Sequence, residues 1–368
     1  MMNSNWSNSA NWLHNGLGAE AGEYPGRLAS PGNPDSLNDA VWFDNHNTGA
    51  ATLDVPINSL KSLHLTNNWN EILTLTQSVT VTGPTGVFAL TDFAEISLAA
   101  NTHLSLVNLG PQAGVGNTWQ GGTITGGEGS SFEVVGSVFS ITAPHGGSGT
   151  NLGTNLIIKQ SSPQQNVGSV ALFSMTENLN LTGVNNYIDV RDGGLLDLGQ
   201  HIDTPNQQNT RGGIVLDALH TGTVAVRVQS GGTLKRFSVP DQGIPDQVVI
   251  EGAVYNLGGT VKVQNGSMLK ITGQDGSGYS YWQQTNELAQ LEVEYGSNII
   301  ATGKYQIDIG TVKLWAGSDS QHERLIGAEL VFGDNFDTIL SIVTRPKERQ
   351  ESSRSRGPSP WGRRPRRR

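Results

Sequence analysis

The feature that most constrains this chain is a recurring unit in which glycine, alone or with a small residue, precedes a short strand. Gly193–Leu198, Gly231–Leu234 and Gly258–Val261 are clear examples. Glycine readily adopts the positive φ that a sharp corner needs, and alternate side chains of the strand that follows point to one face. The unit therefore predicts many short strands joined by tight corners.

Period-two alternation supports the same interpretation elsewhere in the chain. It is clean in Leu73–Thr76, Val79–Thr82, Leu104–Leu106, Val224–Val228 and Val261–Val263. Threonine is frequent at the outward positions, where its branched Cβ suits a pleated surface. These segments are expected to be strands with one buried face.

Composition excludes several other classes of protein. Only 15% of residues are charged, cysteine is absent, and the longest helix-compatible stretch, Glu287–Val293, is shorter than two turns. A coiled coil, a charge-rich disordered protein and a disulfide framework are thereby excluded. No run of 18 apolar residues occurs, so we expect no transmembrane segment.

The expected fold class is all-β, and within it we favour a right-handed parallel β-helix over an array of sandwiches. A solenoid needs Gly-rich corners and one inward row of apolar side chains per strand, which suits the 36% apolar content. The right hand follows from the preference of parallel crossovers. We place this solenoid at residues 51–344, with inserted loops at 160–166, 204–209 and 276–282.

The charge changes abruptly after Thr344. Residues 1–344 carry a formal charge of −17, whereas residues 345–368 carry +8. This Arg-rich tail has almost no aliphatic residues and is expected to be disordered. We favour an out-of-frame origin over an inert tail, and rank nucleic-acid binding last because the acidic body repels a polyanion.

Residues 1–50 form a distinct head segment. It contains Trp6-Ser7-Asn8-Ser9-Ala10-Asn11-Trp12, then a Pro31-Gly32 turn, then Trp42-Phe43-Asp44. This arrangement resembles the start of exported bacterial parallel β-helix surface proteins, of the autotransporter-passenger-like and repeat-rich kind. The matching residues are Trp6, Ser7, Asn11, Trp12, Phe43 and Asp44, and the likeness by motif covers roughly residues 4–83.

The resemblance implies an extracellular or cell-envelope location and a structural or adhesive role. It implies carbohydrate or another cell-surface component as partner, with no cofactor. The printed sequence shows no signal peptide, since it has neither a charged n-region nor an apolar h-region. We therefore expect a fragment of a larger exported protein, with both ends of the natural chain altered.

Two roles compete for the tryptophans of the head. The first coil of a solenoid exposes an unpaired edge and an open apolar end. Trp6, Trp12 and Trp42 could cover that end as a cap, which is the role we favour because most aromatic residues bury area. Stacking of the flat rings on sugars is the alternative.

The richest polar cluster follows one predicted strand. On that strand Asp189 and Arg191 share the outer face, and Asp192 and Asp197 come shortly after. Under an enzyme alternative, these four residues would act in a polysaccharide lyase or glycoside hydrolase, with Ca²⁺ needed only by a lyase. Asp beside Gly is also ordinary turn chemistry, and Asp–Arg pairs decorate solvated faces, so we favour a non-enzymatic role.

One further candidate site is aromatic. Tyr279, Tyr281 and Trp282 occur in a Gly/Ser-rich loop, where they could form a binding platform or fold back onto the stack. The eight histidines show neither a His-x-His nor a His-Glu-x-x-His spacing, so no metal site is expected. The sequence thus predicts a structural or adhesive solenoid, with a polysaccharide-acting enzyme as the alternative.

Overall fold

Alternation of apolar and polar side chains decides where the strands form in the computed structural model. In Val79–Thr82 the two valines are buried and the two threonines are half-buried, and Ile72–Leu75 repeats this pattern. The other alternating segments predicted from the sequence, Leu104–Leu106, Val224–Val228 and Val261–Val263, also lie within strands. The all-β expectation is confirmed.

The structure describes only part of the chain in detail. The described residues are 5–8, 11–14, 17–18, 24–27, 39–45, 49–66, 68–110, 117–142, 149–161, 171–175, 177–198, 212–217, 224–237, 247–264, 267–272, 282–294, 297–316, 325–332 and 340–344. The Arg-rich tail and the predicted loop 204–209 lie outside them, as do most of the predicted loops 160–166 and 276–282.

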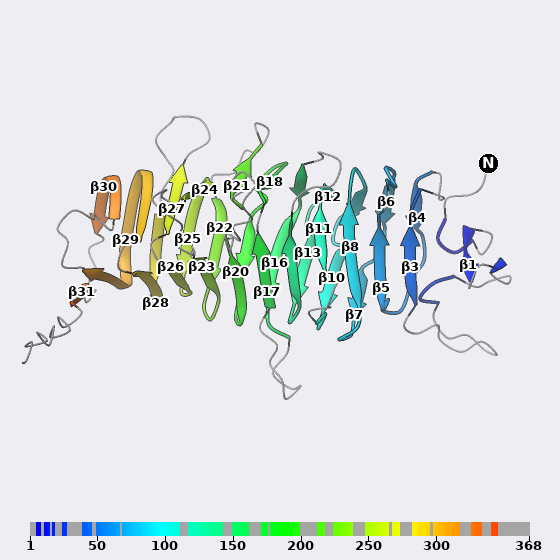
Figure 1. Cartoon of the computed structure of the whole chain (residues 1–368), viewed down its shortest axis with the longest axis horizontal. Coiled ribbons are helices and arrows are strands. Elements are labelled where there is room, and N and C mark those ends of the chain that lie inside the picture. The colour runs from blue at the N-terminus through cyan, green and yellow to red at the C-terminus, as the bar shows by residue number, and fades with distance from the viewer. Residues whose placement is uncertain are drawn as a thin grey trace, which may run out of the picture.

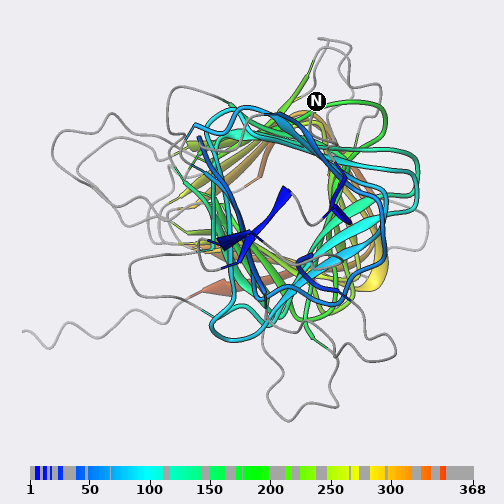
Figure 2. The same ribbon diagram turned by 90° about the vertical axis from the view of Figure 1, so that its right-hand side faces the viewer.

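The strands stack into one elongated ladder (Figure 1). All of its pairings between named strands are parallel, and through most of the ladder each strand pairs with the strand three places before and after it. Three consecutive strands therefore make one coil, and the ladder is a parallel β-helix with three strand faces. The view along its long axis shows the strands around a central interior (Figure 2). The right-handed sense stays a prediction.

We call the three faces A, B and C, and each strand of a face is one rung. Face A contains β7 (Val79–Thr82), β10 (His103–Val107), β13 (Ser131–Val135), β16 (Asn155–Lys159), β19 (Ile188–Val190), β22 (Val224–Gln229) and β25 (Ala253–Leu257). Face B contains β3 (Ala40–Phe43), β5 (Ser62–Leu65), β8 (Val87–Thr91), β11 (Thr118–Gln120), β14 (Val138–Ile141), β17 (Ala171–Met175), β20 (Gly194–Asp197), β23 (Thr233–Phe237) and β26 (Thr260–Gln264). Face C contains β4 (Ala51–Leu53), β6 (Ile72–Leu75), β9 (Glu95–Leu98), β12 (Gly122–Gly126), β15 (Thr150–Gly153), β18 (Leu179–Leu181), β21 (Ile214–Leu216), β24 (Gln247–Glu251) and β27 (Met268–Thr272).

Longer strands continue the ladder toward the C-terminus. β28 (Trp282–Val293) pairs with both β25 and β26, and β29 (Asn298–Ala316) pairs with β27 and β28. β30 (Leu325–Phe332) and β31 (Leu340–Thr344) pair with β29. The helix-compatible stretch Glu287–Val293 lies in β28. Its apolar residues fit the two-residue period of a strand as well as they fit the period of a helix.

The interior is filled by the inward row of each strand. Phe88, Phe139 and Phe173 are buried on face B and Phe132 on face A, and the rings in contact have centroids 5.4 to 5.8 Å apart. Burying one such side chain contributes roughly 1.5–3 kcal/mol. Because these rings touch from coil to coil, each coil is stabilised by its neighbours rather than by its own residues alone.

Glycine at the corners lets consecutive coils approach closely. Gly231 has a φ of +76°, and a Cβ at this position would clash with Oδ1 of Asp192, which lies one coil earlier. The positive φ predicted for Gly193 and Gly258 is confirmed as well. Corners therefore need glycine both for backbone conformation and for space.

The N-terminal end differs from the rest of the ladder. A short antiparallel pair, β1 (Leu13–His14) and β2 (Leu17–Gly18), lies across the end of the interior in both views (Figures 1 and 2). The parallel ladder already begins with β3, within the segment 1–50 that we expected to be a separate head.

Candidate functional site

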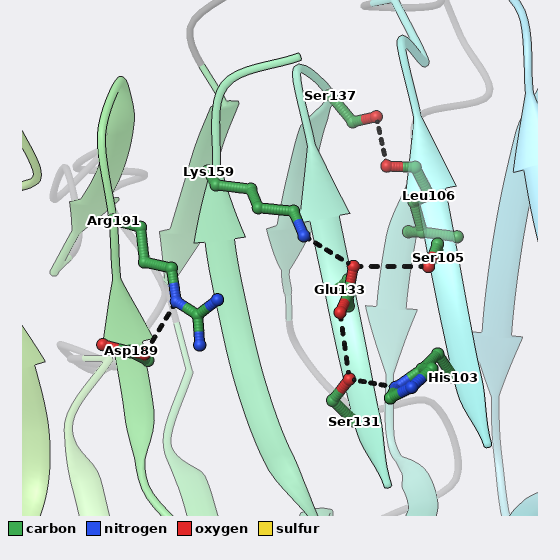
Figure 3. A network of polar contacts seen from close by, with 9 residues as sticks. All are labelled: His103, Ser105, Leu106, Ser131, Glu133, Ser137, Lys159, Asp189 and Arg191. Carbon is green, nitrogen blue, oxygen red and sulfur yellow. Dashed lines mark hydrogen bonds and ion pairs between the residues drawn. The ribbon is translucent and has the colours of Figure 1, made fainter. Parts of the chain in front are cut away.

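Face A carries a network of polar side chains around Glu133 (Figure 3). Nζ of Lys159 lies 3.0 Å from Oε2 of Glu133, and the Ser131 hydroxyl donates to Oε1 at 3.2 Å. Ser105 reaches Oε2 at 3.5 Å, and Nδ1 of His103 lies 2.8 Å from the Ser131 hydroxyl. The network links three consecutive rungs, β10, β13 and β16.

These contacts set the charge state of Glu133. Burial alone would raise the pKa of its carboxyl, but the hydrogen bond and positive charge of Lys159 oppose burial, with help from Ser131 and His103. The net result is a pKa below the ordinary value of glutamate. Glu133 is therefore held as a carboxylate. Sequence reasoning missed this residue, although its alternating Ser131-Phe132-Glu133 pattern places it outward.

Asp189 and Arg191 meet on face A as the sequence predicted. Nε of Arg191 lies 2.8 Å from Oδ2 of Asp189 (Figure 3). Nε2 of Gln229 donates to Oδ1 at 3.1 Å. The Asp189 side chain is only 5% exposed, whereas that of Arg191 is 45% exposed. Both oxygens of this carboxylate are thus engaged by donors.

The other two predicted site residues lie elsewhere. Asp192 lies at the corner after β19, where Nε2 of Gln160 donates to its Oδ2 at 2.8 Å. Asp197 lies on face B, in β20. The four residues of the enzyme alternative are therefore divided between one face, a corner and a second face.

Asp197 has an environment unlike that of Glu133. Its Oδ1 is buried and has no hydrogen-bond partner among the described residues. Burial raises the pKa of Asp197 above the ordinary value, and the charges of Lys235 and Arg236 offset this only in part.

Two carboxylates of face A share a column. Glu133, Ile157 and Asp189 are register partners on consecutive rungs, so Glu133 and Asp189 are about 9.5 Å apart at the backbone. A glycoside hydrolase needs one acid with a raised pKa beside a second, ionised carboxylate. The lowered pKa of Glu133 does not suit the role of that acid.

The predicted aromatic platform is described only in part. Tyr279 and Tyr281 lie outside the described residues. Trp282 is fully buried at the start of β28, so its ring faces the core instead of offering a surface for stacking. Of the two alternatives for this residue, folding back onto the stack is the one observed.

The tryptophans of the head divide between two environments. Trp6 is buried and packs edge-on against Trp12, with ring centroids 4.8 Å apart, and both rings contact Phe43. Trp42 instead points outward and is 55% exposed, with its ring stacked 3.6 Å from that of His64. Burial lowers the pKa of His64 to about 4, so the imidazole beneath Trp42 is neutral at pH 7.

Face A also carries an aromatic contact that sequence reasoning missed. The guanidinium carbon of Arg227 lies 3.8 Å from the centroid of the Tyr187 ring. Arg227 is the register partner of Asp189 on the next rung. The two residues are 38 positions apart, with segments 199–211 and 218–223 between them, so the sequence offered no signal for this neighbour.

Within the described ranges, no three His, Asp or Glu side chains are grouped as a metal site would require. The same ranges hold no helix long and apolar enough to cross a membrane. Comparisons with known proteins found no matching protein-family model, no similar curated protein and no similar solved structure. Fold and site together define a parallel β-solenoid with a charged, self-paired strand face.

Proposed function

We propose that this chain is a non-enzymatic structural or adhesive solenoid that acts outside the cell or at the cell surface. One observation carries the proposal: the carboxylates on face A are already paired with cations of the same or the next rung. Glu133 is bound by Lys159, and Asp189 by Arg191. Such pairing suits a solvated strand face, and the lowered pKa of Glu133 keeps that residue from the protonated state that acid catalysis needs.

The ladder itself supports the structural part of the proposal. Parallel pairing from coil to coil satisfies backbone groups along the stack, and the buried aromatic column joins the coils. Such a ladder is a stiff spacer whose corners and loops can carry specificity. The location is supported by the resemblance of the Trp6-Ser7, Asn11-Trp12 and Phe43-Asp44 motifs to exported surface proteins.

A polysaccharide-acting enzyme is the second candidate, favoured by the column that Glu133 and Asp189 share. Their backbones are about 9.5 Å apart on one outer face, and a glycoside hydrolase likewise needs two carboxylates on the same side of its substrate groove. The low pKa of Glu133 argues against this candidate.

The deciding experiment incubates the full chain with neutral and acidic polysaccharides, with and without Ca²⁺. Reducing ends and unsaturated-uronate absorbance report hydrolysis and elimination. We expect no product. Product that disappears in both Asp189→Asn and Glu133→Gln, but persists in the face B control Glu292→Gln, would replace the proposal with the enzyme alternative.

A further inference from the structure

Arg227 on face A has the environment of a cation that lacks its anion. Asp189 is its register partner on the neighbouring rung. The oxygens of Asp189, however, accept hydrogen bonds from Arg191 at 2.8 Å and Gln229 at 3.1 Å. The nearest carboxylate in register is therefore engaged by other donors.

The guanidinium of Arg227 lies against an aromatic ring instead. Its central carbon is 3.8 Å from the Tyr187 ring centroid, and its Nε is buried without a hydrogen-bond partner. Among the described residues no carboxylate or carbonyl oxygen accepts a hydrogen bond from this guanidinium. Stacking suits the flat, delocalised cation. Nε is the only atom of this guanidinium among the described buried atoms without a hydrogen-bond partner.

The Nη groups of Arg227 are not among the described buried atoms without a partner, so they are the donors that an oxyanion could reach. A buried polar group without a partner loses its hydration with nothing in return, and a charged one loses more. The guanidinium presents a planar fork of donors that matches a carboxylate in a bidentate geometry. A carboxylate of a ligand would therefore accept the hydrogen bonds from Arg227 that Asp189 does not accept.

The surrounding charge favours the same kind of ligand. Lys159, Arg191 and Arg227 belong to three consecutive rungs of face A, which are about 4.8 Å apart. Lys159 and Arg191 have carboxylate partners within the protein, so Arg227 provides the unmatched positive charge.

We infer that Arg227, stacked on Tyr187 and flanked by Arg191, is a binding site for the carboxylate of a uronic-acid residue in an acidic polysaccharide. The inference rests on the proposed adhesive function and names its ligand class. A sulfate ester offers similar oxyanion chemistry, so the test includes both groups. A short oligogalacturonate carries few charges, so the acidic body opposes its binding less than that of a long polyanion.

The test titrates the full chain with oligogalacturonate, its methyl ester and a sulfated neutral oligosaccharide, while product formation is followed in the same mixtures. We expect oligogalacturonate to bind at least about tenfold more tightly than its methyl ester, equivalent to about 1.4 kcal/mol. Equal affinity for acid and ester, or tighter binding of the sulfated ligand, would overturn the inference without requiring any variant.

Three variants locate the site. Arg227→Gln should weaken oligogalacturonate binding about tenfold or more, and Arg227→Lys about threefold, because lysine keeps the charge but loses the fork. The matched control Lys262→Gln removes one charge from face B and should change affinity less than about twofold. Losses of equal size in Arg227→Gln and Lys262→Gln would indicate only nonspecific charge attraction and overturn the assignment.

The two proposals fail in different ways. Uronate binding accompanied by product formation would overturn the non-enzymatic function but keep the site. Absence of uronate binding, with no product, would remove the site but keep the structural role.

Discussion

Two carboxylates in the same column of face B show how the next rung decides the state of a charge. Asp197, Lys235, Lys262, Glu292 and Lys313 are successive register partners. Glu292 lies between two lysines, 3.2 Å from Nζ of Lys262 and 2.8 Å from that of Lys313. Asp197 has Ser174 on one side and Lys235 on the other, and its Oδ1 has no partner among the described residues.

The pKa of Glu292 lies below the ordinary value of glutamate, whereas the pKa of Asp197 lies above the ordinary value of aspartate. Burial alone would raise the pKa of Glu292, but hydrogen bonds from both lysines lower it below the usual value. Burial raises the pKa of Asp197, and no described hydrogen bond opposes it. At these two positions, lysines one coil away oppose the effect of burial, and they outweigh it only at Glu292, where both of them form hydrogen bonds.

The largest effect is expected at a corner where the neighbouring coil leaves no room for a side chain. Gly231→Ala should cost about 1–3 kcal/mol, because alanine is strained at a φ of +76° and its Cβ meets Asp192. Chemical denaturation of both proteins measures the loss. In an Asp192→Ala background the loss should shrink but persist, since only the steric part is relieved. A loss of the same size in both backgrounds would show that Asp192 does not restrict this corner.

An intermediate effect is expected when the well-paired carboxylate is neutralised. Glu292→Gln should destabilise the fold at pH 7 by about 1 kcal/mol, within the range for partly exposed ion pairs. The folded-state pKa of Glu292 is lowered, so its contribution is complete above the unfolded value of 4.5 and is lost as pH falls through the folded pKa. Denaturation curves at pH 7 and pH 3 should therefore show a deficit that shrinks in acid. A deficit independent of pH would contradict the assigned pairing.

The smallest expected effect is a gain in folding stability. Asp197→Asn should stabilise the fold at pH 7 by up to about 1 kcal/mol, because the folded-state pKa is raised and the ionised form carries a burial penalty. That penalty grows as pH rises above the unfolded value of 3.8, so the variant and the parent should converge at pH 3.

A second substitution sharpens the contrast between the two carboxylates. Ser174→Lys supplies a cation on the rung before Asp197, so the pKa of Asp197 should fall toward that of Glu292. Carboxyl chemical shifts followed by NMR titration measure this pKa. An unchanged titration of Asp197 would refute control by the neighbouring rung.

Local alternation was enough to predict the strands and which side chains point inward. The alternation of Val79–Thr82 predicts β7, and the spacing of Asp189 and Arg191 correctly places both on the outer face. The same rule, applied strictly to Ala40–Phe43, would have placed Trp42 outside, as observed. Grouping all three head tryptophans into one cap overlooked that alternation.

Contacts between coils could not be predicted in the same way. The offset between register partners is 24 residues from Ser131 to Asn155 but 38 from Ile188 to Val226. Inserted segments of irregular length thus decide that Arg227 adjoins Asp189 and that Lys262 adjoins Glu292. The burial of Trp282 likewise depends on the register between coils. The Gly/Ser-rich composition of the segment before it was equally compatible with an exposed ring.

The pairing of each strand with the third strand along makes the length of this molecule a modular quantity. Removal of three consecutive strands would bring two existing coils together with the same strand direction and the same inward and outward rows. Reach would then change in steps of about 4.8 Å per coil. A lineage of such proteins can therefore adjust how far it extends by duplicating or deleting coils, while every remaining corner keeps its conformation.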